Sequence, residues 1–247
     1  KLIKEGDVQT HPVWRSVECA IASTRRIVKI AEKHNKKAHI LHITTKEEID
    51  FLSQHKGNIT FEITPQHLTL YAPDCYNKLG TYAQMNPPIR DKSHYDRLWY
   101  GVRNNLNDTI GSDHAPHLKI NKDKVYPNTP SGMPGVQTLL PVMLNHMNDG
   151  KLTLNQLMNF VCENPVKIFG IKNKGFIKEG YDADFTVVDM NKITEIKNEN
   201  IESKCGWTPF DGYKLKGTPI LTIISGKIKM KNGKIIGDPE GNPLEFV

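Results

Sequence analysis

The stretch Gly111-Ser112-Asp113-His114-Ala115-Pro116-His117 places one carboxylate and two imidazoles on a short turn after an apolar approach. A carboxylate that ends a strand is able to ligate a divalent metal, accept a proton from a metal-activated water and return it to a leaving group. His117, four residues after Asp113, would then face an anionic substrate. Alternatively, Asp113 caps a helix and the histidines are solvated, as is usual for a lone Asp-His pair. The turn alone leaves both interpretations open.

His42 is a second candidate, because it lies at the end of an apolar stretch, residues 38–43, that is predicted to form a strand. Neutral imidazole is a common zinc ligand, although a single histidine in such a place is more often a core residue. His39 is expected to face the other side of the strand. Residues 108–113 are predicted to be a barrel strand that runs into its C-terminal loop, which is where barrel enzymes carry their chemistry.

Strand and helix signals alternate along the first part of the chain. This alternation predicts an α/β fold with parallel strands. A long irregular connection is expected over 65–90, and a mobile loop over 118–135. The expected strands and helices are a helix at 16–34, a helix starting near Thr45, a strand at 59–63, and helices at 95–104, 136–147 and 154–162, the last with Thr153 as its N-cap.

The sequence after Gly170 changes to short alternating strands, which predicts a small β unit. Residues 184–189 and 221–225 have the alternation of strands. Residues 225–235 are predicted to form a hairpin, because Asn232-Gly233 is a preferred two-residue turn.

The motif at 111–117 resembles the signature of dihydroorotases, which are cyclic-amide hydrolases of the amidohydrolase superfamily. The runs 64–70 (TPQHLTL), 84–90 (QMNPPIR) and 130–138 (PSGMPGVQT) resemble the same branch, in the same order. The resemblance extends from about His11 to the C-terminus but does not include the family's first half. It implies the C-terminal portion of a metal-dependent (β/α)8 TIM-type barrel, residues 1–170, plus strands of a small β-sandwich subdomain, residues 171–247.

The resemblance also implies roles for individual residues. It implies that His42 and Asp113, on what would be the sixth and eighth barrel strands, are metal ligands. It also implies that the metal is zinc, with two ions in a complete site. Asp113 would in addition be the catalytic proton carrier. The residues implied in substrate binding are Asn86, His117, Gly132 and Gly135.

Several ligands of the family pattern are missing from this sequence. They are the first-strand His-x-His with its following arginine, the bridging lysine or aspartate, and the fifth-strand histidine. Because zinc usually takes at least three protein ligands, the isolated chain is expected to be inactive. The chain opens without methionine, which suggests that an upstream portion is absent. A closed barrel takes ~250 residues and only about 170 here have α/β texture. Because an open piece of barrel would leave apolar edges uncovered, we expect that upstream sequence, a partner chain or a homodimer completes the folded protein.

Composition narrows the functional class. Of 247 residues, 38% are hydrophobic and 24% charged, and no apolar run approaches the ~20 residues that span a membrane. The net charge of +6 is spread over dispersed lysines, which argues against nucleic-acid binding. Four widely separated cysteines indicate a reducing, cytoplasmic compartment rather than a disulfide framework.

Three functions therefore remain open. The first is a dihydroorotase, which interconverts L-dihydroorotate and N-carbamoyl-L-aspartate in pyrimidine biosynthesis. The second is another cyclic amidase, a hydantoinase or allantoinase, because ring choice depends on loops. The third is a non-catalytic dihydroorotase-like subunit that supports aspartate transcarbamoylase.

Overall fold

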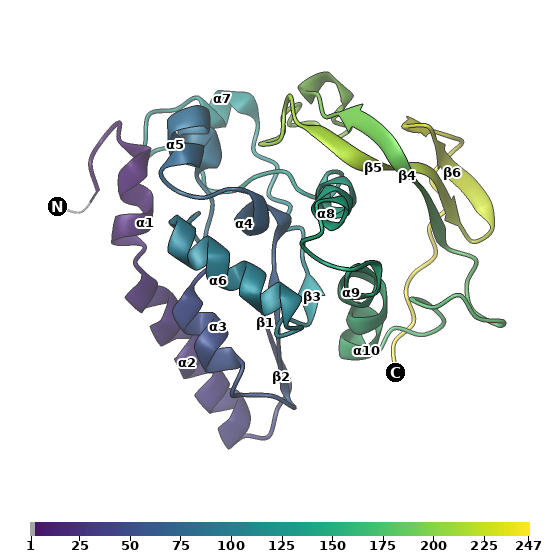
Figure 1. Cartoon of the computed structure of the whole chain (residues 1–247), viewed down its shortest axis with the longest axis horizontal. Coiled ribbons are helices and arrows are strands. Elements are labelled where there is room, and N and C mark those ends of the chain that lie inside the picture. The colour runs from purple at the N-terminus through teal and green to yellow at the C-terminus, as the bar shows by residue number, and fades with distance from the viewer. Residues whose placement is uncertain (1–2) are drawn as a thin grey trace. The chain divides into compact units, whose positions relative to one another are not determined.

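A computed structural model describes residues 3–247 of the chain (Figure 1). The chain divides into two compact units, each of which is described by itself. One unit consists of Lys1–Leu139 and Ile196–Gly212, and the other of Leu140–Glu195 and Tyr213–Val247. Within the described residues, no helix is long and apolar enough to cross a membrane.

The first unit is built on a parallel sheet in the order β1-β2-β3. Its strands are β1 (Ala38–Ile40), β2 (Ile59–Ile63) and β3 (Thr109–Ile110), and β2 pairs in parallel with both others. On β2, buried residues alternate with half-buried Thr60 and Glu62. The apolar side chains thus face the helices, while the polar ones line the opposite face of the sheet.

Helices α2 (Val17–Lys33), α3 (Lys46–Leu52) and α6 (Lys92–Arg103) lie together on one side of this sheet (Figure 1). Each begins where the sequence supplies a cap. The side chains of Ser16 and Asp91 accept backbone N–H bonds, and Thr45 forms a capping box with Glu48. Short helical turns η1 (Val8–Thr10) and α1 (His11–Trp14) precede α2, and η4 (Asn198–Asn200) also belongs to this unit.

The prediction of an irregular connection over 65–90 is wrong. The segment contains α4 (Pro65–Thr69), α5 (Asp74–Leu79) and η2 (Gly80–Ala83). Thr64 caps α4, and Leu68 and Met85 are fully buried. These short helices are stabilised by tertiary burial, for which single-sequence periodicity gives little signal.

The segment 118–135, expected to be a mobile loop, is also more ordered than its composition indicates. It contains the short helix α7 (Lys119–Lys122), and Lys122, the last residue of that helix, is completely buried. Met133 pairs with His114 in an isolated parallel bridge. The segment is therefore held against the turn that carries Asp113.

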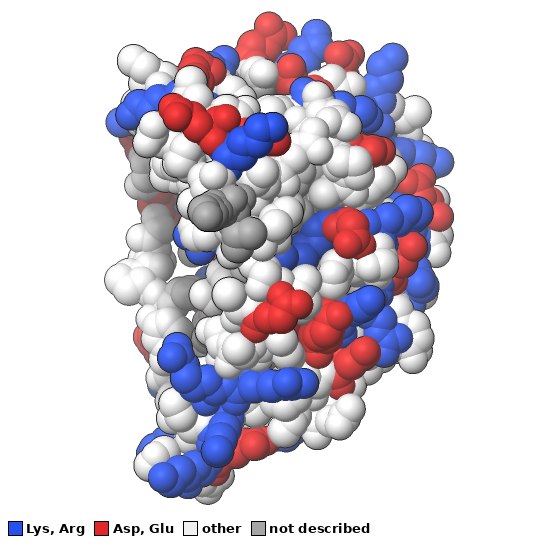
Figure 2. Space-filling model, turned by 90° about the vertical axis from the view of Figure 1, so that its left-hand side faces the viewer, with Lys and Arg blue, Asp and Glu red and all other residues white. Residues whose placement is uncertain are grey.

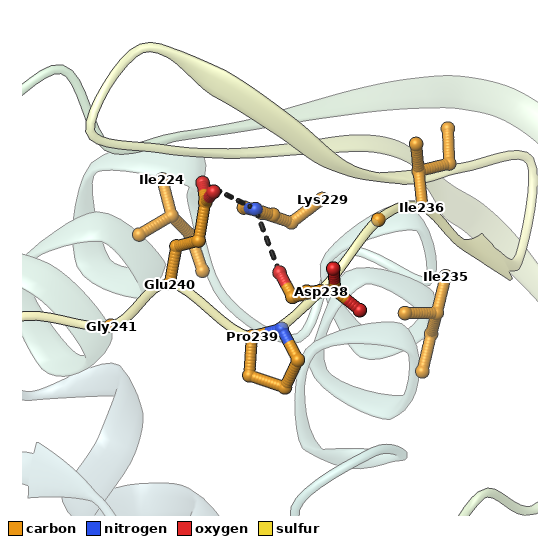
Figure 3. Close-up of a pocket in the computed structure, with 9 residues that line it drawn as sticks. Ile224, Lys229, Ile235, Ile236, Asp238, Pro239, Glu240 and Gly241 are labelled. Carbon is orange, nitrogen blue, oxygen red and sulfur yellow. Dashed lines mark hydrogen bonds and ion pairs between the residues drawn. The ribbon is translucent and has the colours of Figure 1, made fainter.

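The second unit contains an antiparallel sheet in the order β4-β5-β6-β7. Its strands are β4 (Phe185–Glu195), β5 (Lys214–Ile224), β6 (Lys227–Lys231) and β7 (Lys234–Ile235). The predicted hairpin is confirmed, because Asn232 and Gly233 both have positive φ between β6 and β7. Lys229 of β6 donates hydrogen bonds to Glu240 and to the carbonyl of Asp238, two residues that follow β7 and line a small pocket (Figure 3).

Helices α8 (Leu139–Asn148), α9 (Leu154–Met158) and α10 (Asn164–Phe169) accompany that sheet, with a π-helical turn over Asn159–Glu163. Thr153 caps α9 as predicted, in a capping box with Gln156. Asn145 and Asn148 of α8 bond the backbone of Lys216 on β5. The parallel sheet with its helices and the separate antiparallel sheet confirm the predicted fold class.

Candidate active site

His42 and Asp113 lie just beyond the ends of β1 and β3, the strands on either side of β2. Both have left-handed backbone conformations, with φ of 43° and 40°, which are uncommon for residues other than glycine. Burial raises the pKa of the Asp113 carboxyl, with Glu62 adding to the rise, while the charge of His42 opposes it. The charges of the two predicted ligands therefore interact.

The chemistry of the donors fits part of a cation site. Nδ1 of His42 is buried without a hydrogen-bond partner, which is costly unless a ligand satisfies it. A carboxylate beside an unpaired imidazole nitrogen is a suitable donor pair for zinc. Among residues 3–247, however, no group of three or more His, Cys, Asp or Glu side chains is arranged to hold a metal. His42 and Asp113 therefore form an incomplete ligand set.

Glu62 and His39 belong to the same face, which the sequence interpretation missed. Nε2 of His39 lies 3.5 Å from Oε2 of Glu62, and its Nδ1 lies 2.8 Å from Oγ1 of Thr60. The expectation that His39 faces away from the site is wrong, because the backbone leaves the strand alternation before His42. The alternation Thr60, Glu62 within β2 is a sequence signal that would have placed Glu62 here.

Asn86 is oriented by a buried hydrogen-bond relay. Nε2 of His11 lies 3.0 Å from both Oδ1 of Asn86 and the carbonyl of Met85, so it must be the donor. Nδ1 of His11 then accepts from Tyr126, whose hydroxyl accepts from Trp14 at 2.6 Å. Burial lowers the pKa of His11, which favours this neutral ring. With its oxygen engaged, Asn86 presents its N–H2 group to a ligand.

Gln66 and His67 connect this loop to the turn at Asp113. The Gln66 amide donates to the carbonyl of Ser112 at 2.9 Å. His67 is buried, accepts from Thr64 and donates from Nε2 to the carbonyl of Pro87 at 3.1 Å. Sequence reasoning assigned no role to either residue, and their part here is to position the backbone.

Gly132 and Gly135 allow the 130–135 loop to approach the Asp113 turn closely. A Cβ at Gly135 would lie 2.2 Å from the carbonyl oxygen of Ser112, and one at Gly132, where φ is +142°, 2.6 Å from Cβ of Ala115. His117 is bonded through Nε2 to the carbonyl of Ser131 at 3.0 Å, which leaves its Nδ1 for a ligand. The predicted substrate-binding residues of this loop are thus gathered beside Asp113.

Comparison with known proteins gives the class of this fold and site. The sequence profile of the amidohydrolase family matches residues 15–229, and the chain belongs to that family. It is 39% identical over 225 residues to the dihydroorotase of Pyrococcus furiosus, which covers 91% of this chain and 52% of that protein. It is 37% identical to the dihydroorotase of Methanosphaera stadtmanae, over 89% of this chain and 51% of that protein.

Solved structures give the same class. An L-hydantoinase from Arthrobacter aurescens superposes with a TM-score of 0.84 at 29% identity, over 87% of this chain and 49% of that one. A D-hydantoinase superposes with a TM-score of 0.87 at 26% identity, over 93% of this chain and 52% of that one. The chain spans about half the length of the relatives it matches. The resemblance to dihydroorotases is confirmed, and metal dependence is a general property of this family.

Replacing Gly135 by alanine is expected to destabilise the protein by about 1–3 kcal/mol, because the new methyl group overlaps the Ser112 carbonyl. Urea unfolding measures the loss. Gly241→Ala is the matched control, since a Cβ there meets no atom within 4 Å. Equal stability of the two variants would contradict the close approach.

Acidification is expected to lower the free energy of unfolding through His67. Burial, with the charges of His42 and Arg90, lowers the pKa of His67 from 6.5 to about 3. Between these values the unfolded chain binds a proton that the folded chain does not, so stability is lost as pH falls, by up to about 1.4 kcal/mol per pH unit. Urea unfolding at pH 7, 6 and 5 should show a smaller slope for His67→Gln than for His34→Gln, a variant of an exposed histidine. Equal slopes would sink this assignment.

Proposed function

We propose that this chain forms the C-terminal part of the catalytic barrel of a dihydroorotase, which reversibly hydrolyses the ring amide of L-dihydroorotate to N-carbamoyl-L-aspartate in pyrimidine biosynthesis. The observation that carries the proposal is that His42 and Asp113 lie past the ends of the strands flanking β2, where their charges interact and the buried Nδ1 of His42 has no hydrogen-bond partner. The identity of 39% to a dihydroorotase, over an alignment long enough to span the motif at 111–117, supports this reaction.

In this proposal His42 and Asp113 hold zinc, two ions in the complete site, and sequence outside these 247 residues supplies the remaining ligands. Bound zinc would supply Lewis acidity, which lowers the pKa of water and polarises the ring carbonyl. Asp113 accepts the proton of the attacking water and passes it to the departing ring nitrogen.

Substrate contacts come from the two loops. Asn86 donates from its N–H2 group to a ring carbonyl, since His11 occupies its oxygen. Nε2 of His117 donates to the carbonyl of Ser131, and His117 would bind the substrate carboxylate through Nδ1–H when that nitrogen also carries a proton. The backbone at Gly132 and Gly135 approaches the ring. These contacts favour an acidic pyrimidine ring over other cyclic amides.

The remaining barrel strands would pair with the free edge of β1. Beside that edge an open groove of about 680 Å³ is lined by residues of α2 and β1, and Ile27, Ile30 and Leu41 are exposed there. An unpaired strand edge with exposed apolar neighbours is a pairing surface. We propose that the N-terminal half of the barrel, or a partner chain in a homodimer, covers it and is required for activity. This chain together with that sequence is called the complete enzyme below.

The division into barrel residues 1–170 and β-subdomain residues 171–247 is part of the proposal. So is a cytoplasmic location, which the four free cysteines support.

Figure 2 shows basic and acidic side chains interspersed on one face of the molecule, with some basic ones gathered at its lower end. The ligand that we propose for this protein, dihydroorotate or N-carbamoyl-aspartate, is a small anion.

Hydantoinase or allantoinase activity is the second candidate, because the solved structures named above are hydantoinases. Turnover of dihydroorotate, hydantoin and allantoin by the complete enzyme separates the candidates. A complete enzyme that binds no zinc and turns over none of them would instead be a non-catalytic subunit, of the kind that supports aspartate transcarbamoylase.

Asp113→Asn is expected to lower kcat of the complete enzyme for dihydroorotate by roughly 10²- to 10⁴-fold, because the amide cannot carry the proton. Steady-state kinetics measures the loss. Asp123→Asn, on an exposed carboxylate bonded to Tyr82, is the control and should retain normal kcat. A kcat for Asp113→Asn within about threefold of the unaltered enzyme would contradict the assigned role.

Asn86→Asp is expected to raise KM for dihydroorotate on the order of 10- to 100-fold, since a carboxylate oxygen would replace the N–H2 donor opposite the ring carbonyl. Asn77→Asp, on the exposed side of α5, controls for the added charge. An unchanged KM for Asn86→Asp would show that this amide does not donate to the substrate.

A further inference from the structure

Lys122 is a buried cation that the proposed reaction does not use. It ends α7, and its residue is 0% exposed. Its Nζ donates to the carbonyls of Gln84 at 3.1 Å, Pro130 at 3.0 Å and Gly132 at 3.3 Å. An ammonium has three N–H donors, and each finds one carbonyl here. We call this arrangement the carbonyl clamp.

The cation is held without a carboxylate. Among the described residues no salt bridge involves Lys122, and the ring of Trp207 lies 5.7 Å from Nζ. Burial lowers the pKa of the Lys122 ammonium to about 8. Removing an ammonium from water is costly, and an apolar side chain of similar length would fill this space without that cost. Burying the Lys122 ammonium is therefore unfavourable in itself, and its contribution to the structure is the three hydrogen bonds to carbonyls.

Those bonds join the two proposed ligand-binding loops. Gln84 comes two residues before Asn86, and its carbonyl also accepts from the backbone N–H of Gly132 at 2.9 Å. The Gln84 amide donates to the carbonyl of Thr129 at 2.9 Å and to Oγ of Ser131 at 3.0 Å. The clamp therefore fixes the distance between the loop that carries Asn86 and the loop that carries Gly132.

The same network reaches His117. Its Nε2 bonds the carbonyl of Ser131, and its own carbonyl accepts from Nε1 of Trp207 at 2.7 Å. Trp207 is buried and its ring faces Lys122. A shift of the 130–135 loop would therefore move His117 as well as Gly132.

We propose that Lys122 is a positioning residue for substrate binding: its ammonium holds the Asn86 loop, the 130–135 loop and His117 in the arrangement that receives the ligand. The inference rests on the proposed function, because that function makes these groups substrate contacts. Lys122 itself touches carbonyls and no reacting atom. Its loss should therefore weaken binding more than it slows the chemical step.

The test replaces Lys122 by methionine in the complete enzyme. The expected result is a KM for dihydroorotate raised roughly 10- to 100-fold with kcat within about threefold, because displaced loops lose substrate contacts. Hydrogen exchange at the Gly132 amide should quicken by about tenfold or more, as the bond to Gln84 loosens. Lys119→Met, on an exposed lysine of the same helix, should change neither quantity. Lys122→Arg should recover part of the KM, because it restores a buried donor.

An unchanged KM and unchanged Gly132 exchange in Lys122→Met would overturn the inference. So would a fall in kcat at constant KM, which would indicate a role in the chemical step. Faster Gly132 exchange in Lys122→Met supports the clamp even if the unaltered complete enzyme does not turn over dihydroorotate. That last result would refute the proposed function separately.

Should Lys122→Met fail to fold, the unaltered protein still tests the clamp. Nitrogen-15 NMR of the lysine side chains near pH 6 should show one ammonium whose protons exchange slowly with water, because three carbonyls hold them. Lys122→Arg should remove that signal. A lysine spectrum with only rapidly exchanging ammonium groups would overturn the inference.

Discussion

The site depends on the electrostatic interaction between His42 and Asp113, which lie past the ends of the two strands that flank β2. Neither residue continues its strand, since both adopt left-handed backbone conformations, His42 two residues past the last paired residue of β1 and Asp113 three past that of β3. Such conformations are strained for non-glycine residues and persist only where surrounding structure enforces them. At the Asp113 turn, Gln66 binds the Ser112 carbonyl and the carboxylate of Glu62 lies against Gly111.

The surrounding loops are ordered by buried polar contacts as well as by burial of apolar side chains such as Leu68 and Met85. His67 bonds Pro87, His11 bonds Asn86, and Lys122 bonds three carbonyls, each from a buried side chain. Buried polar groups are costly when left unsatisfied, so each of these contacts favours one loop arrangement over its alternatives. Gly132 and Gly135 complete the arrangement by leaving room for backbone contact.

The sequence was sufficient to predict features that depend on neighbouring residues, such as helix starts and tight turns. The cap at Thr153 and the Asn232-Gly233 turn are found as expected, and the helices expected to begin near Ser16 and Thr45 do begin there. The helices within 65–90 were missed because burial of residues such as Leu68 stabilises them. Glu62 could have been found from the alternation in β2, whereas nothing around Lys122 signals burial. Its carbonyl partners come from Gln84, 38 residues earlier, and from Pro130 and Gly132 on the following loop.

Zinc-edge anomalous diffraction from crystals of the complete enzyme tests the central claim most directly. The account predicts an anomalous peak about 2.0–2.2 Å from a ring nitrogen of His42 and from a carboxylate oxygen of Asp113, or two neighbouring peaks that share these ligands. A zinc peak that contacts neither side chain, in an enzyme that turns over dihydroorotate, would contradict it.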